Sequence, residues 1–450
     1  MSKLRSNGSF VRLFTGRLVT NVGDSLYMIG AMWLVYELTG SPMYTGLAGF
    51  LVQIPRTLQF LVGPLVDRWP LRPVLVYSQV IQATCVLVVP VAAIAGHLSV
   101  WVVLAVMPAL AFINQFVYPA QNAALPRIVN DDQLVRANSL FSMAYQSSDA
   151  IFNAASGIVI AIIGTIALFV VNAITFAIAA LLFLGVVVPP SGSDHGAGGV
   201  RDDSEDAEST TSHSDSESTT RSDTENGAGS SYLADLVTGI RYIRGSAVLA
   251  LVLGVMVANA AFGATLAVLP AFADLLGGPE IYGALMAAYA GGLFVGTIGS
   301  TLVERYRYGL ICAVGFCWAA AALSIALVVS GWIVTVAFFF VTFVPIGTFS
   351  VLFWSMVQSA VDDRLLGRVT SITSSLAAVM LPLGSLTGGI VAERVGVVAV
   401  MGVLTVAFVL LSAYFVVNPR LRRLPPVADA TETSLGLRHR VDRDSPADGA

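Results

Sequence analysis

The sequence predicts an all-α membrane protein with twelve transmembrane helices arranged as two six-helix pseudo-repeats. Over half of the 450 residues (56%) are hydrophobic and only 12% are charged, which excludes most soluble protein classes. The two halves also share residues at fixed offsets. Leu65, Val66, Asp67 and Arg68 are answered 237 positions later by Leu302, Val303, Glu304 and Arg305. Six residues recur 232 positions later, with Asp131, Leu134, Arg136, Ser139, Gly157 and Gly164 returning as Asp363, Leu366, Arg368, Ser371, Gly389 and Gly396.

Twelve apolar stretches have the length of about 20 residues that a helix needs to cross the hydrocarbon. The first half places them at roughly 13–37, 44–66, 73–95, 99–121, 137–163 and 166–188. The second half places them at roughly 247–272, 280–303, 309–330, 332–356, 369–393 and 397–417. Duplicated helix bundles are the usual build of secondary transporters, whose substrate sites lie near the middle of the membrane.

The basic residues predict how these helices are oriented. This assignment puts 22 of the 24 lysine and arginine residues on one side of the membrane, in the termini and the even-numbered connections. Basic residues mark cytoplasmic loops. We therefore expect a multi-pass protein of the cell (plasma) membrane with both termini in the cytoplasm.

Composition divides the chain into five segments. Residues 1–188 and 246–418 are the two six-helix bundles. The segment 189–231 is rich in Ser, Thr, Asp, Glu and Gly, which predicts a disordered cytoplasmic linker. Residues 232–245 carry an apolar helical face with Arg241 and Arg244 beside it, which predicts an amphipathic helix on the cytoplasmic membrane surface. Residues 419–450 are expected to form a flexible cytoplasmic tail.

Several motifs resemble the major facilitator superfamily. Gly63-Pro-Leu-Val-Asp67-Arg68-Trp-Pro-Leu-Arg72 is similar to the loop signature that this family carries between spans two and three. The segments that begin at Asn21, Pro119 and Leu134 resemble its drug- and siderophore-exporting branch, which includes macrolide efflux proteins and the enterobactin exporter. The resemblance covers roughly residues 10–420 and implies the major facilitator fold.

Charged residues at the cytoplasmic helix ends are candidates for a gate. An acid there can pair with an arginine or with the N-terminus of a neighbouring helix, and the resemblance suggests span eleven as the partner. Such contacts would hold the cytoplasmic side shut, whereas a role as helix caps and topology determinants is the alternative. The candidate gate residues are Gly63, Asp67, Arg68, Arg72, Arg136, Glu304, Arg305 and Arg368.

Three ionisable residues lie well inside predicted spans, where they are costly and usually functional. Asp24 and Arg56 each lie 16 residues from Gly40, the centre of the first hairpin, and should therefore meet at one depth on adjacent helices. Asn21 and Gln59 mirror each other in the same way. The pair either fixes packing or takes part in substrate or proton coupling.

The third intramembrane charge, Asp149, belongs to a polar stripe that we expect to face the bundle or a watery cavity. The stripe consists of Ser142, Gln146, Asp149, Asn153 and Ser156. Burial without a counter-charge favours a protonated carboxyl, as a proton carrier requires, unless Arg56 or a carbonyl group already satisfies Asp149. Further candidates for the cavity are Gln53, Asn114, Tyr118 and Asn259, for which bundle-stabilising hydrogen bonds are the alternative.

These features predict a secondary transporter that exports small hydrophobic or amphipathic compounds, drug- or siderophore-like, by rocker-switch alternating access. Protons or another ion are candidate coupling ions, as in an antiporter. Metabolite uptake or symport, and a non-transporting sensor or lipid-moving protein, are the alternatives. No motif for an enzyme, a cofactor, a metal site or nucleic-acid binding is found, and the four histidines all lie in loops or tails. We expect a monomer.

Overall fold

The computed structural model describes residues 4, 6–57, 69–189, 245–361 and 363–436. These residues form helices and connections without a strand. The first bundle contains α2 (Gly8–Thr39), α3 (Pro42–Thr57), α5 (Leu71–Ile94), α6 (Val100–Ile128), α7 (Asp131–Ile163) and α8 (Thr165–Leu184). The second contains α10 (Ala247–Leu276), α11 (Pro279–Val303), α12 (Tyr308–Val328), α13 (Trp332–Ala360), α14 (Asp363–Val395) and α15 (Val397–Val417).

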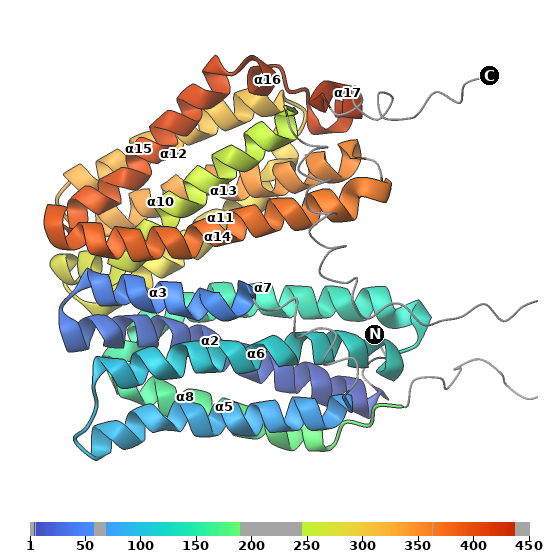
Figure 1. Cartoon of the computed structure of the whole chain (residues 1–450), viewed down its shortest axis with the longest axis vertical. Coiled ribbons are helices and arrows are strands. Elements are labelled where there is room, and N and C mark those ends of the chain that lie inside the picture. Colours follow the sequence, from blue (N-terminus) through green and yellow to red (C-terminus); the bar gives the residue numbers. More distant parts are fainter. Residues whose placement is uncertain (1–3, 5, 58–68, 190–244, 362, 437–450) are drawn as a thin grey trace, which may run out of the picture.

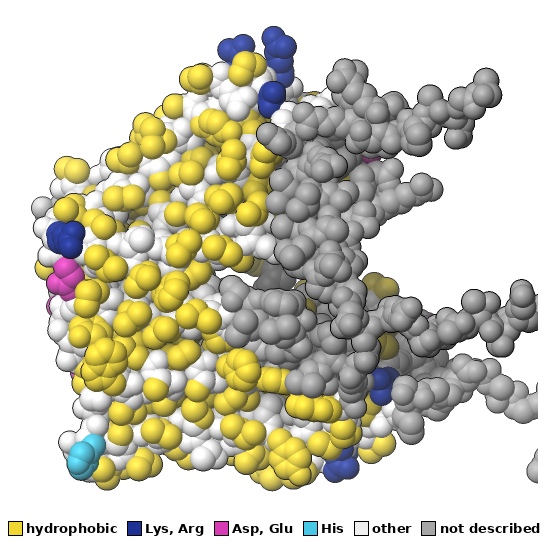
Figure 2. Space-filling model, in the orientation of Figure 1, with side chains coloured by type: hydrophobic (Ala, Val, Ile, Leu, Met, Phe, Trp, Pro, Cys, Tyr) yellow, Lys and Arg dark blue, Asp and Glu magenta, His cyan; other side chains and the backbone are white. Residues whose placement is uncertain are grey.

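The molecule is a multi-pass membrane protein. In the described part of the chain, 10 helices are long and apolar enough to cross a bilayer, and α3 and α7 occupy the two remaining places of the predicted pattern. Figure 2 shows apolar side chains over much of the described surface between the ends of the helices, with the visible basic groups near those ends. The all-α class and the two similar halves are confirmed.

The sequence repeat is visible in the bounds of the helices. α6 and α13 begin and end 232 residues apart, and so do α7 and α14. α5 and α12 instead begin 237 residues apart. The offset therefore falls by five residues between the start of α12 and the start of α13. α12 is three residues shorter than α5, and the α12–α13 connection is two residues shorter than the α5–α6 connection. The two offsets in the sequence therefore describe one duplication with a local deletion or insertion.

Two glycine crossings join the bundles. Gly157 of α7 lies against Gly283 of α11, and Gly46 of α3 lies against Gly389 of α14, so closely that a Cβ at any of them would overlap or crowd the opposite backbone. Glycine permits this approach because it has no side chain. Gly157 and Gly389 correspond at the 232-residue offset, and Gly46 and Gly283 at the 237-residue offset. The two crossings are thus equivalent in the two halves.

The described chain begins and ends at the same end of the molecule, here called the terminal side. The bundles separate toward that side and converge at the opposite end, the far side (Figure 1). Hydrogen bonds reinforce the convergence. The Tyr36 hydroxyl donates to Asp274 at 3.1 Å, the Ser41 hydroxyl donates to Glu393, and the Thr45 hydroxyl donates to the Ala267 carbonyl. Each bond links the first bundle to the second.

The chain after α15 differs from the flexible tail that we expected at 419–450. Residues 419–436 form α16 (Pro419–Arg422), the 3-10 turn η1 (Val427–Asp429) and α17 (Glu432–Leu435). Leu421, Leu424 and Leu435 are each at most 1% exposed, and the Tyr308 amide donates to the Pro425 carbonyl at 3.2 Å. This segment is therefore packed against the second bundle. The predicted linker, almost all of the amphipathic segment, and residues 437–450 lie outside the described residues.

Candidate functional site

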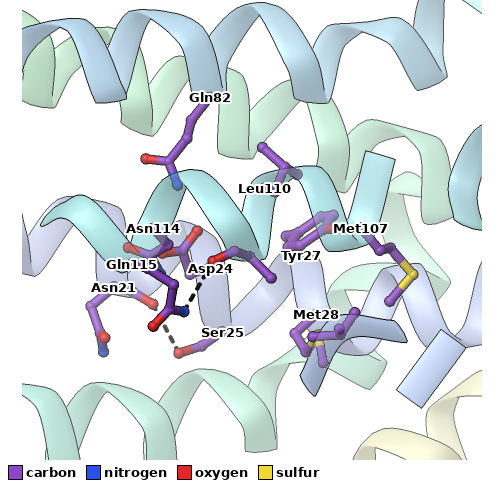
Figure 3. A pocket seen from close by; sticks show the side chains of 12 residues that line it. Asn21, Asp24, Ser25, Tyr27, Met28, Gln82, Met107, Leu110, Asn114 and Gln115 are labelled. Atoms are coloured by element: carbon purple, nitrogen blue, oxygen red, sulfur yellow. Dashed lines mark hydrogen bonds between the residues drawn. The ribbon is translucent and has the colours of Figure 1, made fainter. Parts of the chain in front are cut away.

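A cavity of about 380 Å³ lies inside the first bundle. Four helices line it: α2 contributes most of the polar groups, α6 the opposite wall, and α3 and α5 one residue each. Its residues are Asn21, Asp24, Ser25, Tyr27, Met28, Val52, Gln82, Met107, Leu110, Ala111, Asn114 and Gln115, and Figure 3 shows them from close by. We call it the Asp24 cavity.

Amide and hydroxyl groups surround the carboxyl group in this cavity. The Gln115 side chain donates to the Ala111 carbonyl at 3.0 Å, and the Ser25 hydroxyl donates to the Asn21 carbonyl at 2.8 Å. Both bonds stay within their own helices, so they shape the wall without crossing the cavity. Asp24 itself lies near the middle of α2, at the depth where a charge in a membrane most needs polar surroundings.

Tyr27 adds a polar group that the described residues do not satisfy. Its side chain is 6% exposed, and its hydroxyl has no hydrogen-bond partner in the described part of the chain. Burial of such a hydroxyl is unfavourable unless water or a ligand bonds to it. Tyr27 lines the cavity beside Met107 and Leu110, so its hydroxyl is available to a polar group inside the cavity.

A second polar cluster lies toward the terminal side and centres on Arg17, which is 7% exposed. The Arg17 Nε donates to the Gln121 side-chain Oε1 at 2.8 Å and to the Tyr145 hydroxyl at 3.2 Å. Its guanidinium also lies 5.7 Å from the centre of the Tyr145 ring. Tyr145 in turn donates to Gln121. The acceptors that the described residues offer this cation are neutral, and together they tie α2 to α6 and α7.

The two polar clusters belong to one seam between the antiparallel helices α2 and α6. Seven residues separate Arg17 from Asp24, and seven separate Gln121 from Asn114. Each spacing corresponds to two helical turns, about 10 Å along the axis. The seam therefore carries a buried cation near the terminal side and a carboxyl group deeper in the membrane.

The second bundle carries rings at the corresponding place. The 237-residue offset maps Asp24 onto Ala261 and Ser25, another cavity residue, onto Phe262. Phe262 packs on Tyr289 with ring centres 4.9 Å apart, and Tyr289 packs on Phe343 at 4.8 Å. The two halves thus differ chemically at the same level, with a polar cavity in one and an aromatic cluster in the other.

Of the predicted cavity residues, the structure brings Asn21, Asp24 and Asn114 together. Gln53 is half-buried on α3 and Tyr118 is 49% exposed one turn beyond Asn114, and neither lines the Asp24 cavity. Four further candidates cannot be placed relative to it, because the side chains of Arg56, Gln146 and Asp149 and the whole of Gln59 lie outside the described residues. The Asp24–Arg56 pair and the role of Asp149 therefore stay predictions.

Asn259 does not contribute to this cavity. Its side-chain amide donates to the Ala377 carbonyl at 2.8 Å and joins α10 to α14 inside the second bundle. This contact is a hydrogen bond between helices, the alternative role that the sequence analysis gave for this asparagine.

The predicted gate is only partly described. Gly63, Asp67 and Arg68 lie outside the described residues, and so does the side chain of Arg368. Arg72 donates to the Leu184 carbonyl at the end of α8. Arg305 contacts the neighbouring Tyr306, with its guanidinium 5.1 Å from the ring centre, and Arg136 and Glu304 are exposed. The gate therefore stays a prediction.

Sequence reasoning missed Tyr27, Gln82 and Arg17. Gln82 is 2% exposed and accepts from Gln79 at 3.3 Å, and two glutamines three apart in an apolar helix were a usable signal. Arg17 was counted only as a marker of orientation, although its spacing puts it on the same face of α2 as Asn21 and Asp24. Among the described residues, no group of three His, Cys, Asp or Glu side chains could hold a metal ion.

This arrangement defines a polytopic membrane protein whose two similar bundles meet at one side and enclose polar sites within the membrane. Comparison with protein-family models identifies the family. The model of the Major Facilitator Superfamily matches residues 13–385, which is more than half of the chain, and the protein belongs to this superfamily. Its members are transporters rather than enzymes.

Two curated relatives are efflux proteins by name. Macrolide efflux protein A of Streptococcus pyogenes is 22% identical over 402 residues, covering 86% of this chain and 90% of the relative. Multidrug efflux pump Tap of Mycolicibacterium fortuitum is 25% identical over 434 residues, covering 93% and 97%. Both similarities extend over most of this chain.

Solved structures with the same fold are more distant in sequence. A bacterial homologue of the iron transporter ferroportin, in an inward-facing state, matches with a TM-score of 0.65 at 14% identity, over 91% of this chain and 98% of that one. A nucleoside transporter matches with a TM-score of 0.63 at 13% identity, over 91% and 98%. At such low identity these similarities establish the fold alone.

Proposed function

We propose that this protein is a secondary active transporter that exports small hydrophobic or amphipathic compounds by rocker-switch alternating access. In this proposal both termini are cytoplasmic and the protein resides in the cell membrane. The bundles then pivot about the glycine crossings, and the described state is open to the cytoplasm because it is closed on the far side. Export rather than uptake is supported by the two relatives named as efflux proteins.

The Asp24 cavity is the observation that carries this proposal. It combines one carboxyl group with amides and an unsatisfied hydroxyl, in a wall that is otherwise apolar. Such a site suits a compound with one basic or polar group on an apolar body. A carboxylate attracts a cation strongly in a medium of low dielectric constant. The same carboxyl can bind a proton in exchange for the substrate, so protons are the coupling ion in this proposal.

Ethidium, an apolar cation, is a suitable probe. Expression of the protein in a bacterial host that lacks its own efflux pumps should lower ethidium accumulation, and Asp24→Asn should restore it. Asp132→Asn is the matched control, because Asp132 is an exposed carboxylate at the start of α7 outside the cavity. The proposal fails if wild-type protein leaves accumulation of ethidium and of a broad compound panel unchanged. Transport in proteoliposomes without a proton gradient would refute the proton coupling alone.

The candidate gate is part of the same proposal. When the cytoplasmic side closes, Asp67 and Arg68 would approach the start of α14, and Glu304 and Arg305 would approach the start of α7. Contacts worth a few kcal/mol are sufficient to bias a two-state equilibrium. Double substitution of Glu304 and Arg305 by alanine should therefore slow export without abolishing substrate binding.

A further inference from the structure

A cleft runs between the bundles where α7 faces α11. Its volume is about 1230 Å³, several times larger than the Asp24 cavity. Its residues on α7 extend from Val135 to Ile151, a distance of about 24 Å at the rise of an α-helix. The hydrocarbon of a bilayer is about 30 Å thick, so this α7/α11 cleft covers most of the membrane's depth from the terminal side. The crossing of Gly157 and Gly283 closes it beyond that point.

The two walls of the cleft differ in chemistry. The α7 wall carries the polar side chains Asn138, Ser139, Ser142 and Ser147, all of them exposed, whereas Ala287 and Phe294 form part of the α11 wall. Among the described residues that line the cleft, none is ionisable. Polar side chains on a membrane helix point away from lipid tails and toward water or a ligand. Among these four side chains, the Asn138 amide can make the most hydrogen bonds to a bound molecule.

The cleft is distinct from the Asp24 cavity, since the two share no residue. A charged group would find no counter-charge among the described residues of the cleft, although the Asp24 cavity offers a carboxyl. A long apolar chain with an uncharged polar side fits its shape and its two walls. Met143, Ile151 and Phe294 are each at least 60% exposed and would supply the apolar contacts at successive depths.

We propose that the α7/α11 cleft binds the alkyl chain of a single-chain amphiphile that enters from the cytoplasmic leaflet of the bilayer. This inference rests on the proposed function, which it extends by naming the substrate class and its route. A substrate of this class reaches the transporter sideways through the membrane and presents its basic head to Asp24 only afterwards. Water-soluble cations would bypass the cleft through the opening between the bundles.

Dodecylamine with a diazirine at the end of its chain is the probe for this site. We expect irradiation of the protein in lipid nanodiscs to label Met143, Ile151 or Phe294, and excess unlabelled dodecylamine to suppress this labelling more than fivefold. Ser142→Phe and Ala287→Phe fill the cleft from opposite walls and should each reduce labelling by a similar factor. Ile158→Phe is the matched control, since Ile158 is 60% exposed on α7 beyond the glycine crossing.

The outcomes separate the two proposals. Labelling reports occupancy of the cleft whether or not transport occurs, whereas the ethidium assay reports transport by a compound that does not need the cleft. The inference is overturned if both filling variants are folded and label like the wild type. It is also overturned if a diazirine phosphatidylcholine labels the same residues and dodecylamine does not displace it, because the cleft would then hold ordinary lipid. Loss of ethidium export with intact labelling would sink only the proposed function.

Discussion

At the scale of single residues, Tyr27 is an informative member of the Asp24 cavity. Its buried hydroxyl has no partner among the described residues, so we expect it to bond to a ligand in the cavity. Tyr27→Phe should therefore weaken ethidium binding by about 2- to 10-fold, which corresponds to one hydrogen bond of about 0.5–1.5 kcal/mol. Fluorescence titration of the purified protein measures this change.

Thr405→Val is the control for Tyr27→Phe. The Thr405 hydroxyl is likewise buried and without a partner among the described residues, but it lies on α15 of the second bundle, away from the cavity. Its removal should leave ethidium affinity unchanged and the melting temperature equal or higher, because an unsatisfied polar group is lost. Equal affinities for wild type and Tyr27→Phe would mean that the hydroxyl serves no bound molecule.

Substitutions in the Arg17 cluster should change the stability of the protein, and Gln121→Leu should destabilise it more than Tyr145→Phe. Gln121→Leu removes the closest acceptor of a buried guanidinium and should lower the free energy of unfolding by about 1–3 kcal/mol. Tyr145→Phe keeps the aromatic ring beneath the cation and should cost less, near the value of about 0.6 kcal/mol for hydrogen bonds between membrane helices. Denaturant unfolding in detergent tests the order. A larger loss for Tyr145→Phe would contradict it.

Sequence could identify part of the site because an ionisable or amide residue stands out within an apolar span. Asp24, Asn21 and Asn114 were found in this way and do lie together. Tyr27 could not be found from the sequence, because most tyrosines in membrane helices serve in packing. The structure is needed to see that its hydroxyl has no partner among the described residues. The bond that the Asn259 amide makes could not be predicted either, because its acceptor, the Ala377 carbonyl, is distant in sequence.

At the scale of helices, we expect the two equivalent glycine crossings to control how often the far side opens. Gly283→Ala places a Cβ against the backbone of Gly157, which cannot move aside as a side chain would, and such overpacking costs about 1–3 kcal/mol. The far side should then open more often. A cysteine at position 45, buried in the wild type, should react faster with a water-soluble maleimide in a background without the three native cysteines.

Gly402→Ala is the matched substitution. No atom lies within 4 Å of a Cβ at Gly402, and alanine is about 1 kcal/mol more favourable than glycine within a helix. The reactivity at position 45 should stay at its starting value in this variant, with equal or higher stability. If Gly283→Ala also leaves the reactivity unchanged, the crossing does not control access from the far side.

Helix positions were predictable to a greater extent than the connections. The 232- and 237-residue offsets in the sequence reappear in the helix bounds, because a duplicated apolar pattern of spanning length has one physical solution in a bilayer. The packed segment at 419–436 was not predictable. Leu421, Leu424 and Leu435 are spread over turns too short to give a helical period, and their burial depends on surfaces of the second bundle that only folding creates.

At the scale of the whole molecule, hydrogen bonds from hydroxyls to carboxyls join the bundles on the far side at Tyr36–Asp274 and Ser41–Glu393. Alternating access requires these contacts to break whenever that side opens. In a background without native cysteines, Ser41→Cys with Glu393→Cys should react with a short bis-methanethiosulfonate, which forms a reducible disulfide with each thiol, since the native side chains touch. The cross-linked protein should lose ethidium export almost completely, and reduction should restore it. Ser41→Cys alone, treated identically, should keep exporting. If the cross-linked double variant still exports ethidium, the two bundles do not need to separate on the far side during transport.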